Sequence, residues 1–369
     1  MCAVLRHDSC KTASPVKFSK NMKRAISYIT LLALSAAFVV SCEKKTSTNQ
    51  NEASYRYWQA WVEAQKADHP DYLWRKTALG SYILEDTGGG GTALGSSELV
   101  PYVYLNYTAT DLDGTITESN IVSVAKQLGT YDPSNCYDPV LKIRGEGNMP
   151  AGIDELVAGM CPGQKVKAVV PAWLNAGSKR YDSEQEYIKN VAGTAAIYEL
   201  EVIDGVVNYQ DFQIAQILKA ARARYNKFID AADTVKSGVY YIQLREPTDT
   251  AGVTPGGSSY VNYTGRYLNG QAFDTTLKDT AKVNNIYSAD KTYSAQTLNW
   301  AENDEDITMG SGEGSSLIDG FKDGIAQMKY GEKGVVLFIS DKGYGNSGNS
   351  PIPGFCPLMF ELELLKENE

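Results

Sequence analysis

The chain has 369 residues, of which 43% are hydrophobic, and a formal net charge of −9 at pH 7. This acidic balance argues against nucleic-acid phosphates or anionic lipid surfaces as binding partners. His7 and His69 are its only histidines, and its six cysteines show no Cys-x-x-Cys spacing. We therefore expect neither a metal site nor another cofactor.

The first residues have the pattern of a bacterial lipoprotein signal peptide. Residues 22–24 form a charged start, an apolar run follows at 25–40, and Cys42 closes it. The run is shorter than the roughly 20 residues that a membrane-spanning helix needs. We expect cleavage before Cys42 and lipidation of that cysteine, with 1–41 as the signal peptide and an upstream extension. An uncleaved N-terminal anchor is the alternative.

An internal repeat follows this leader. Residues 42–76 are interpreted as a lipidated tail and a helical lead-in, because tryptophans and other apolar residues recur there at helical spacing. The segments 77–207 and 237–369 then share three blocks in the same order. These blocks pair 106–108 with 262–264, 151–165 with 319–333, and 196–202 with 358–364. Three blocks in one order indicate a duplicated domain.

The segment between the copies and the second copy itself show helical and strand patterns. Residues 208–236 carry apolar side chains on one helical face, which predicts a helical connector docked on a domain. In the second copy, an amphipathic helix is expected after Ser316, and the apolar run 335–339 is expected to be a strand. Each copy should be α+β, an antiparallel sheet of about five strands curled around one short helix.

The second copy carries a series of short motifs, which are Tyr263-Thr264-Gly265, Phe273-Asp274, Gly343-Tyr344-Gly345, Pro351-Ile352-Pro353 and a final strand from Leu358. In their order and spacing, from about Val239 to Lys366, these motifs resemble those of the FKBP-type peptidyl-prolyl cis-trans isomerases. The resemblance implies two tandem FKBP-like domains joined by the helical connector, with the second copy as the isomerase domain. It also implies polypeptides that contain proline as substrates.

The resemblance implies a site in the second copy. An apolar cavity that grips the prolyl ring and holds a twisted amide needs no nucleophile or metal. The catalytic candidates are Tyr263, Asp274 and Tyr344, with Asp274 orienting Tyr263 or polarising the amide. In the family, the second aliphatic residue at the helix entrance also offers its backbone N–H to the ligand carbonyl. The substrate-binding candidates are Phe273, Leu317, Ile318, Phe321, Ile352 and Phe360.

Several positions depart from the family pattern. Phe321 stands where the family has a tryptophan, and 277–305 is an insertion in the second copy with no assigned role. In the first copy, Thr117-Glu118 replaces Phe273-Asp274, and the aliphatic pair becomes Met149-Pro150. Proline has no N–H to bind a substrate carbonyl, so we expect this copy to be non-catalytic.

Of the remaining cysteines, Cys136 and Cys161 could pair in an oxidising compartment or be small buried hydrophobes. The leading hypothesis is a lipid-anchored prolyl isomerase of the bacterial envelope, at the outer membrane, that acts on exported proteins. The alternative is a non-catalytic FKBP-like subunit of an outer-membrane secretion, assembly or motility complex.

Overall fold

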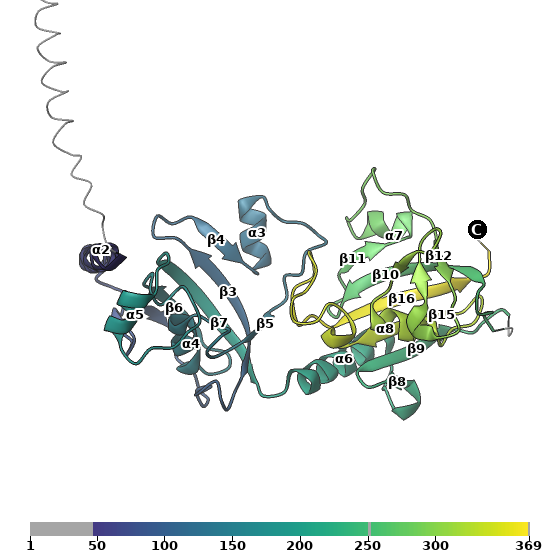
Figure 1. Ribbon diagram of the computed structural model, residues 1–369, viewed down its shortest axis with the longest axis horizontal. Helices are drawn as coiled ribbons and strands as arrows, with labels where there is room; N and C mark the ends of the chain where they lie inside the picture. Colours follow the sequence, from purple (N-terminus) through teal and green to yellow (C-terminus); the bar gives the residue numbers. More distant parts are fainter. Residues whose placement is uncertain (1–46, 250–251, 368–369) are drawn as a thin grey trace, which may run out of the picture. The chain divides into compact units, whose positions relative to one another are not determined.

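The computed structural model describes residues 47–249 and 252–367. The expected signal peptide and its lipidation site, Cys42, lie outside the described residues. Tyr55–Glu369 forms one compact unit, and this unit holds two antiparallel sheets (Figure 1). No helix in the described part of the chain has the length and apolar character that a bilayer crossing demands.

The first sheet has seven strands within the described residues, in the order β1-β2-β6-β7-β3-β4, with β5 also paired to β3. Its central strand is β3 (Tyr102–Thr110), which pairs with β7 along its length and with β5 and β4 at its two ends. The other elements are β1 (Arg75–Lys76), β2 (Tyr82–Asp86), β4 (Ile116–Ser119), α3 (Val122–Leu128), β5 (Val140–Ile143), α4 (Ala151–Ala158), β6 (Lys165–Val170), α5 (Glu184–Asn190) and β7 (Ala196–Val206).

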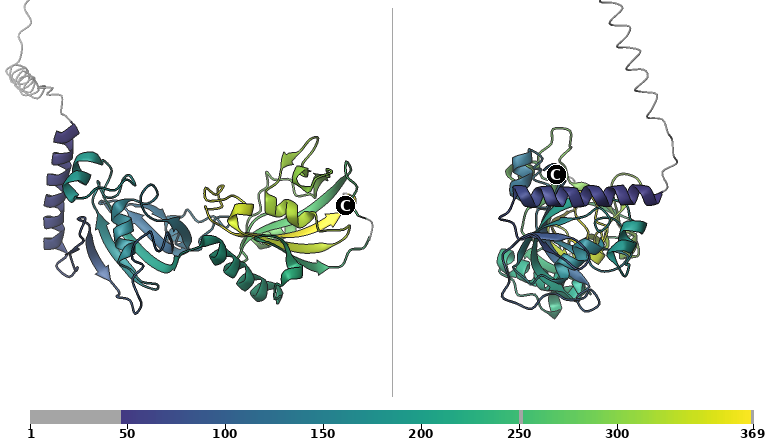
Figure 2. Two further views of the ribbon diagram at one scale, coloured as in Figure 1. Left: turned by 60° about the horizontal axis from the view of Figure 1, so that its bottom comes forward. Right: turned by 90° about the vertical axis from the view of Figure 1, so that its left-hand side faces the viewer.

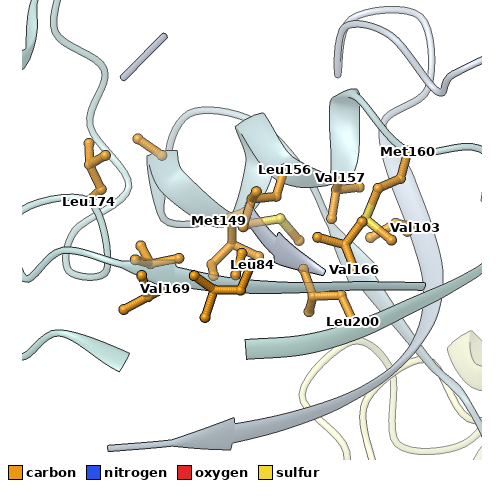
Figure 3. Close-up of a cluster of buried hydrophobic side chains, with 14 of the residues drawn as sticks. Leu84, Val103, Met149, Leu156, Val157, Met160, Val166, Val169, Leu174 and Leu200 are labelled. Carbon is orange, nitrogen blue, oxygen red and sulfur yellow. The ribbon is translucent and has the colours of Figure 1, made fainter. Parts of the chain in front are cut away.

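Helix α4 fills the concave side of this sheet. Its side chains Leu156 and Val157 are buried and point toward strand residues such as Leu84 and Val166 (Figure 3). Helix α2 (Ser47–Asp68) adds Trp58 and Val62 to the same core. The predicted lead-in over 42–76 is therefore helical only to Asp68 within the described residues, and its Trp58 and Trp61 pack on the first core. Figure 2 shows this helix, in purple, beside the first sheet.

The second sheet has nine strands within the described residues, in the order β14-β13-β12-β10-β16-β15-β9-β8, with β11 also paired to β10. Strand β10 (Ser258–Tyr267) takes the place that β3 has in the first sheet, since it pairs with β16, β12 and β11. The other elements are β8 (Thr234–Lys236), β9 (Val239–Arg245), β11 (Ala272–Thr275), α7 (Lys278–Val283), β12 (Gln296–Asn299), β13 (Thr308–Met309), β14 (Ser315–Ser316), α8 (Asp319–Ile325), β15 (Lys333–Phe338) and β16 (Leu358–Leu365), with short 3-10 turns at 231–233, 304–306 and 340–342.

The predicted insertion is not peculiar to the second copy. Helix α7 follows β11 as helix α3 follows β4, and a stacked tyrosine pair lies beyond each helix. The pairs are Tyr131 with Tyr137 and Tyr287 with Tyr293, each with ring centroids 5.4 Å apart. The two copies therefore share this segment as well as the order of their strands.

The connector is shorter than the helix predicted over 208–236. Helix α6 (Tyr209–Tyr225) ends where Asn226 adopts a left-handed conformation with φ of 50°, and Thr234–Lys236 forms strand β8. Asparagine tolerates this conformation and commonly ends helices. The predicted docking is confirmed, because Ile217 and Ala221 are buried against Leu337 and other apolar residues on one face of the second sheet.

Helix α8 lies unusually close to β15. A Cβ atom at Gly320 would come within 2.2 Å of the Phe338 ring. We predict that Gly320→Ala lowers the free energy of unfolding by about 1–3 kcal/mol, because the helix or the ring must move. Urea denaturation measures the loss.

Gly90→Ala is the matched control, because no atom lies within 4 Å of a Cβ atom built there. Equal stabilities for the two variants would contradict the close packing of α8 on β15.

Candidate active site

A hydrogen-bonded pair of polar side chains marks the site in the second copy. Asp274 lies opposite Gly265 where β11 pairs with β10, so its carboxylate reaches back to the neighbouring Tyr263. The Tyr263 hydroxyl donates to Asp274 Oδ2 at 2.7 Å. Burial is the main cause that raises the pKa of Tyr263 well above its usual range, and the Asp274 charge adds to it. Tyr263 is therefore a neutral hydrogen-bond donor rather than a base.

Aromatic rings surround this pair, and Gly265 makes room for two of them. A Cβ atom at Gly265 would lie 2.6 Å from the Phe273 ring and 2.9 Å from the Phe360 ring. Phe360 contacts the rings of Tyr263, Phe273, Phe321 and Phe338 at centroid distances of 6.1, 5.7, 5.2 and 5.9 Å. Phe360 is thus the central ring of this aromatic cluster.

The entrance of helix α8 supplies the floor and one backbone donor. Phe321 lies in the first turn of the helix, is 3% exposed, and meets Tyr263 edge to face at 5.9 Å. Leu317 and Ile318 precede the helix and are half-buried against the same core. Ile318 is the N-cap residue, and its N–H has no acceptor among the residues that the structure describes. This N–H is free to donate a hydrogen bond to a ligand carbonyl.

The loop before β16 brings the last two predicted residues. Tyr344 is half-buried and Ile352 is 6% exposed, and both pack against the second core. Tyr344 is close enough to Tyr263 to contribute to its raised pKa. The structure therefore gathers all nine predicted site residues of the second copy around one apolar core, on β10, β11, α8, β16 and the adjoining loops.

Lys291 is a site neighbour that the sequence did not reveal. Its ammonium group contacts Asp274 Oδ1, so the Asp274 carboxylate is shared between a lysine and Tyr263. A cavity of about 490 Å³ adjoins the pair and is lined in part by Phe273, Lys291 and Tyr293. The segment after α7 thus forms one wall beside the site. No sequence motif identifies Lys291, because its role depends on how this segment folds back.

The first copy retains the polar pair but changes the rest. Tyr107 donates to Glu118 as Tyr263 does to Asp274, and both pairs lie eleven residues apart. This common spacing is the signal that could have found Glu118 as a paired residue. On the neighbouring strand β7, Tyr198 lies opposite Ala109, and its hydroxyl donates to Asn175 Oδ1 at 2.8 Å.

The helix entrance of the first copy also differs from the second. Pro150 is the N-cap residue of α4, as Ile318 is of α8, and Ile153 takes the position of Phe321. Proline cannot supply the backbone donor that Ile318 supplies. Tyr107, Glu118, Pro150 and Ile153 nevertheless line a cavity of about 480 Å³. Asn346, Pro353 and Phe355 of the second copy line the same cavity, so the first copy offers a cavity without the donor that is partly bounded by the loop of the second copy.

Comparisons with known proteins agree with this geometry. The family described as FKBP-type peptidyl-prolyl cis-trans isomerase matches residues 250–365. FK506-binding protein 1A of Aspergillus fumigatus is 35% identical over 109 residues, which are 29% of this chain and 75% of that protein. Human peptidyl-prolyl cis-trans isomerase FKBP9 is 26% identical over 267 residues, and the match takes in 72% of this chain but only 34% of that relative's length.

One solved structure is described as the three FKBP domains of wheat FKBP73. It matches 78% of this chain and 93% of its own, with 15% sequence identity and a TM-score of 0.26.

The raised pKa of Tyr263 gives a pH prediction. An unfolded tyrosine ionises near pH 10, whereas folded Tyr263 keeps its proton to higher pH. Its contribution to stability is therefore fully present below about pH 10 and is lost as the pH rises toward the folded pKa. We predict that Tyr263→Phe costs about 1–2 kcal/mol at neutral pH and less at about pH 11. Urea unfolding at both pH values tests this, and an unchanged difference would contradict it.

Proposed function

Since this chain belongs to the FKBP-type peptidyl-prolyl cis-trans isomerase family, we propose that its second copy catalyses cis-trans isomerisation of X-Pro bonds. The observation that carries the proposal is the aromatic cluster around Phe360 together with the unoccupied N–H of Ile318 within the described residues. These features provide an apolar seat for a prolyl ring and a donor for the preceding carbonyl.

The chemistry requires no bond to be made or broken. Rotation about the amide has a barrier of about 18–20 kcal/mol because resonance keeps the amide planar. A site lowers this barrier when it binds the twisted amide more tightly than the planar one. The low-polarity surroundings of Phe321 and Phe360 remove water that would stabilise the planar amide.

We assign roles by position around the proposed prolyl ring. Phe321 forms the floor, Phe360 the back wall, and Phe273 and Ile352 the sides, with Leu317 at the entrance. The Ile318 N–H binds the carbonyl of the residue before proline. Tyr263, held by Asp274, and Tyr344 lie beside this aromatic cluster, and we assign them as hydrogen-bond donors to the substrate. Lys291 forms an ion pair with Asp274, and the Asp274 carboxylate orients Tyr263.

The first copy is proposed to be non-catalytic. It keeps the Tyr107–Glu118 pair and a cavity, but Pro150 removes the donor that would hold the substrate carbonyl. Without that hydrogen bond, the twisted amide gains no preference over the planar one at this position. The pocket can still bind apolar or prolyl segments as a docking site.

Catalysis is tested with the whole chain and a proline peptide whose trans form alone is cleaved by chymotrypsin. We expect acceleration of the cis-to-trans step, and about a tenfold lower kcat/KM for Asp274→Asn and for Tyr344→Ala, which corresponds to about 1.4 kcal/mol. Both side chains are partly exposed, so folding should survive the substitutions.

Glu118→Gln is the matched control, because Glu118 holds the equivalent position in the first copy. It should leave kcat/KM unchanged. A folded wild-type chain with no acceleration would refute the enzyme and leave the non-catalytic subunit of an envelope complex as the function. Equal losses in the Glu118 and Asp274 variants would contradict the assignment of catalysis to the second copy alone.

We further propose that the chain is held in the bacterial envelope, at the outer membrane, by lipid on Cys42 and acts on exported polypeptides. Support comes from the charged start, the apolar run and the cysteine that ends it. Several acyl chains on one cysteine are sufficient for stable attachment.

The anchor is tested by Cys42→Ser. We expect the variant to move from the membrane fraction to the soluble fraction, because acyl chains rather than an apolar helix hold the protein. Fractionation and immunoblotting measure the shift, with Cys161→Ser as the control that keeps the wild-type distribution. Full membrane retention of the Cys42 variant would refute the lipid anchor.

A further inference from the structure

Two cysteines from different copies of the repeat meet in the structure. Cys136 lies between α3 and β5 in the first copy, and Cys356 lies just before β16 in the second. Both are free and half-buried, and both line one cavity of about 340 Å³. Cys136 packs against the core of the second copy rather than that of its own.

The pKa of Cys356 also depends on Cys136. The Cys136 thiol is the main cause, ahead of burial, that raises the pKa of Cys356 well above its usual range. The sequence left open whether Cys136 pairs with Cys161 or both are small buried hydrophobes, and in the structure the two cysteines are not paired. The Cys161 sulfur lies 3.2 Å from Gln164 Oε1 within the first core, and Cys161 is free.

Hydrogen bonds from the second copy hold the segment around Cys136. The Tyr267 hydroxyl donates to the Ser134 carbonyl at 2.9 Å, and Gln271 Nε2 donates to the Asn135 carbonyl at 2.6 Å. Asn269 Nδ2 donates to Asp138 Oδ1 at 2.9 Å. Cys136 is therefore held in place by the β10–β11 turn of the second copy.

The segment that carries Cys356 is also held. Gln213 Nε2 of helix α6 donates to the Phe355 carbonyl at 3.0 Å, and the Phe355 N–H donates to the Gly345 carbonyl at 2.8 Å. The Phe355 ring meets Tyr102 and Tyr209 edge to face. Two thiols held by separate anchored segments have a high effective concentration toward each other.

We propose that Cys136 and Cys356 form a disulfide that joins the first copy to the substrate-site loop of the second. The oxidant is a disulfide, either a small one such as oxidised glutathione or a thiol oxidase. The Cys136 thiolate attacks one oxidant sulfur, which breaks the oxidant's S–S bond and releases one thiol. The Cys356 thiolate then attacks the Cys136 sulfur of the mixed disulfide and releases the second thiol. Two protein thiols are oxidised and one disulfide is reduced to two thiols.

This crosslink would act on the site through the loop between β15 and β16. Tyr344 and Ile352 belong to that loop, and Cys356 closes it. In the reduced protein the loop is held by the hydrogen bonds described above, whereas the disulfide would tie it covalently to residues 133–138. Oxidation therefore constrains both the substrate-site loop and the unfolded chain.

The test uses the full chain incubated with oxidised glutathione, then treated with a thiol-alkylating reagent and digested without reduction. We expect the loss of two alkylatable thiols, a Cys136–Cys356 linked peptide in the mass spectrum, and a melting temperature about 5 °C higher than in the reduced chain. Cys161→Ser should keep the linked peptide and the thermal shift.

Cys136→Ser should abolish both effects, with unchanged circular dichroism in its reduced form. Cys356→Ser should do the same, and if it fails to fold, Cys136→Ser alone decides the question. The proposal is overturned if a folded, oxidised wild-type chain still carries alkylated Cys136 and Cys356. Recovery of Cys136 linked to another cysteine overturns it as well.

Discussion

The site depends on the absence of a side chain at Gly265. Its Cα lies beneath the rings of Phe273 and Phe360, and any Cβ there would overlap both. Because the β10–β16 register sets Gly265 opposite Phe360, this one position decides whether two rings can close over the strand. In the first copy Ala109 stands at the equivalent position, and Thr117 replaces the ring of Phe273, so a Cβ fits.

The duplicated copies therefore share a scaffold but not a binding surface. Both keep the tyrosine–carboxylate pair across the same hairpin, and both carry the segment with stacked tyrosines. They differ at the helix entrance, where Pro150 of the first copy holds the position of Ile318 in the second. They also differ in the first turn of the helix, where Ile153 replaces Phe321. The polar pair is thus common to both copies, whereas the cluster of rings and the backbone donor are features of the second copy.

Sequence reasoning found the features that local pattern encodes. The strands around Tyr263 and Phe360, the helix after Ile318 and the repeat itself follow from apolar periodicity and motif order. It did not find the Lys291 contact or the neighbour of Cys136, because both depend on how loops fold back over distant strands. The helical connector was predicted too long, because the left-handed turn at Asn226 that ends helix α6 does not interrupt the spacing of apolar residues.

Helix α6 has a consequence for how the second copy can be isolated. Ile217 and Ala221 cover Tyr240, Ile242 and Leu337, which form the apolar reverse side of the second sheet. A fragment that begins at β8, the first strand of this sheet in the sequence, would expose this apolar surface to water and would tend to aggregate. The smallest autonomous piece of the second copy must therefore begin at the N-cap of α6, Asn208. Helix α6 links the two copies in the sequence, but by its packing it belongs to the second copy.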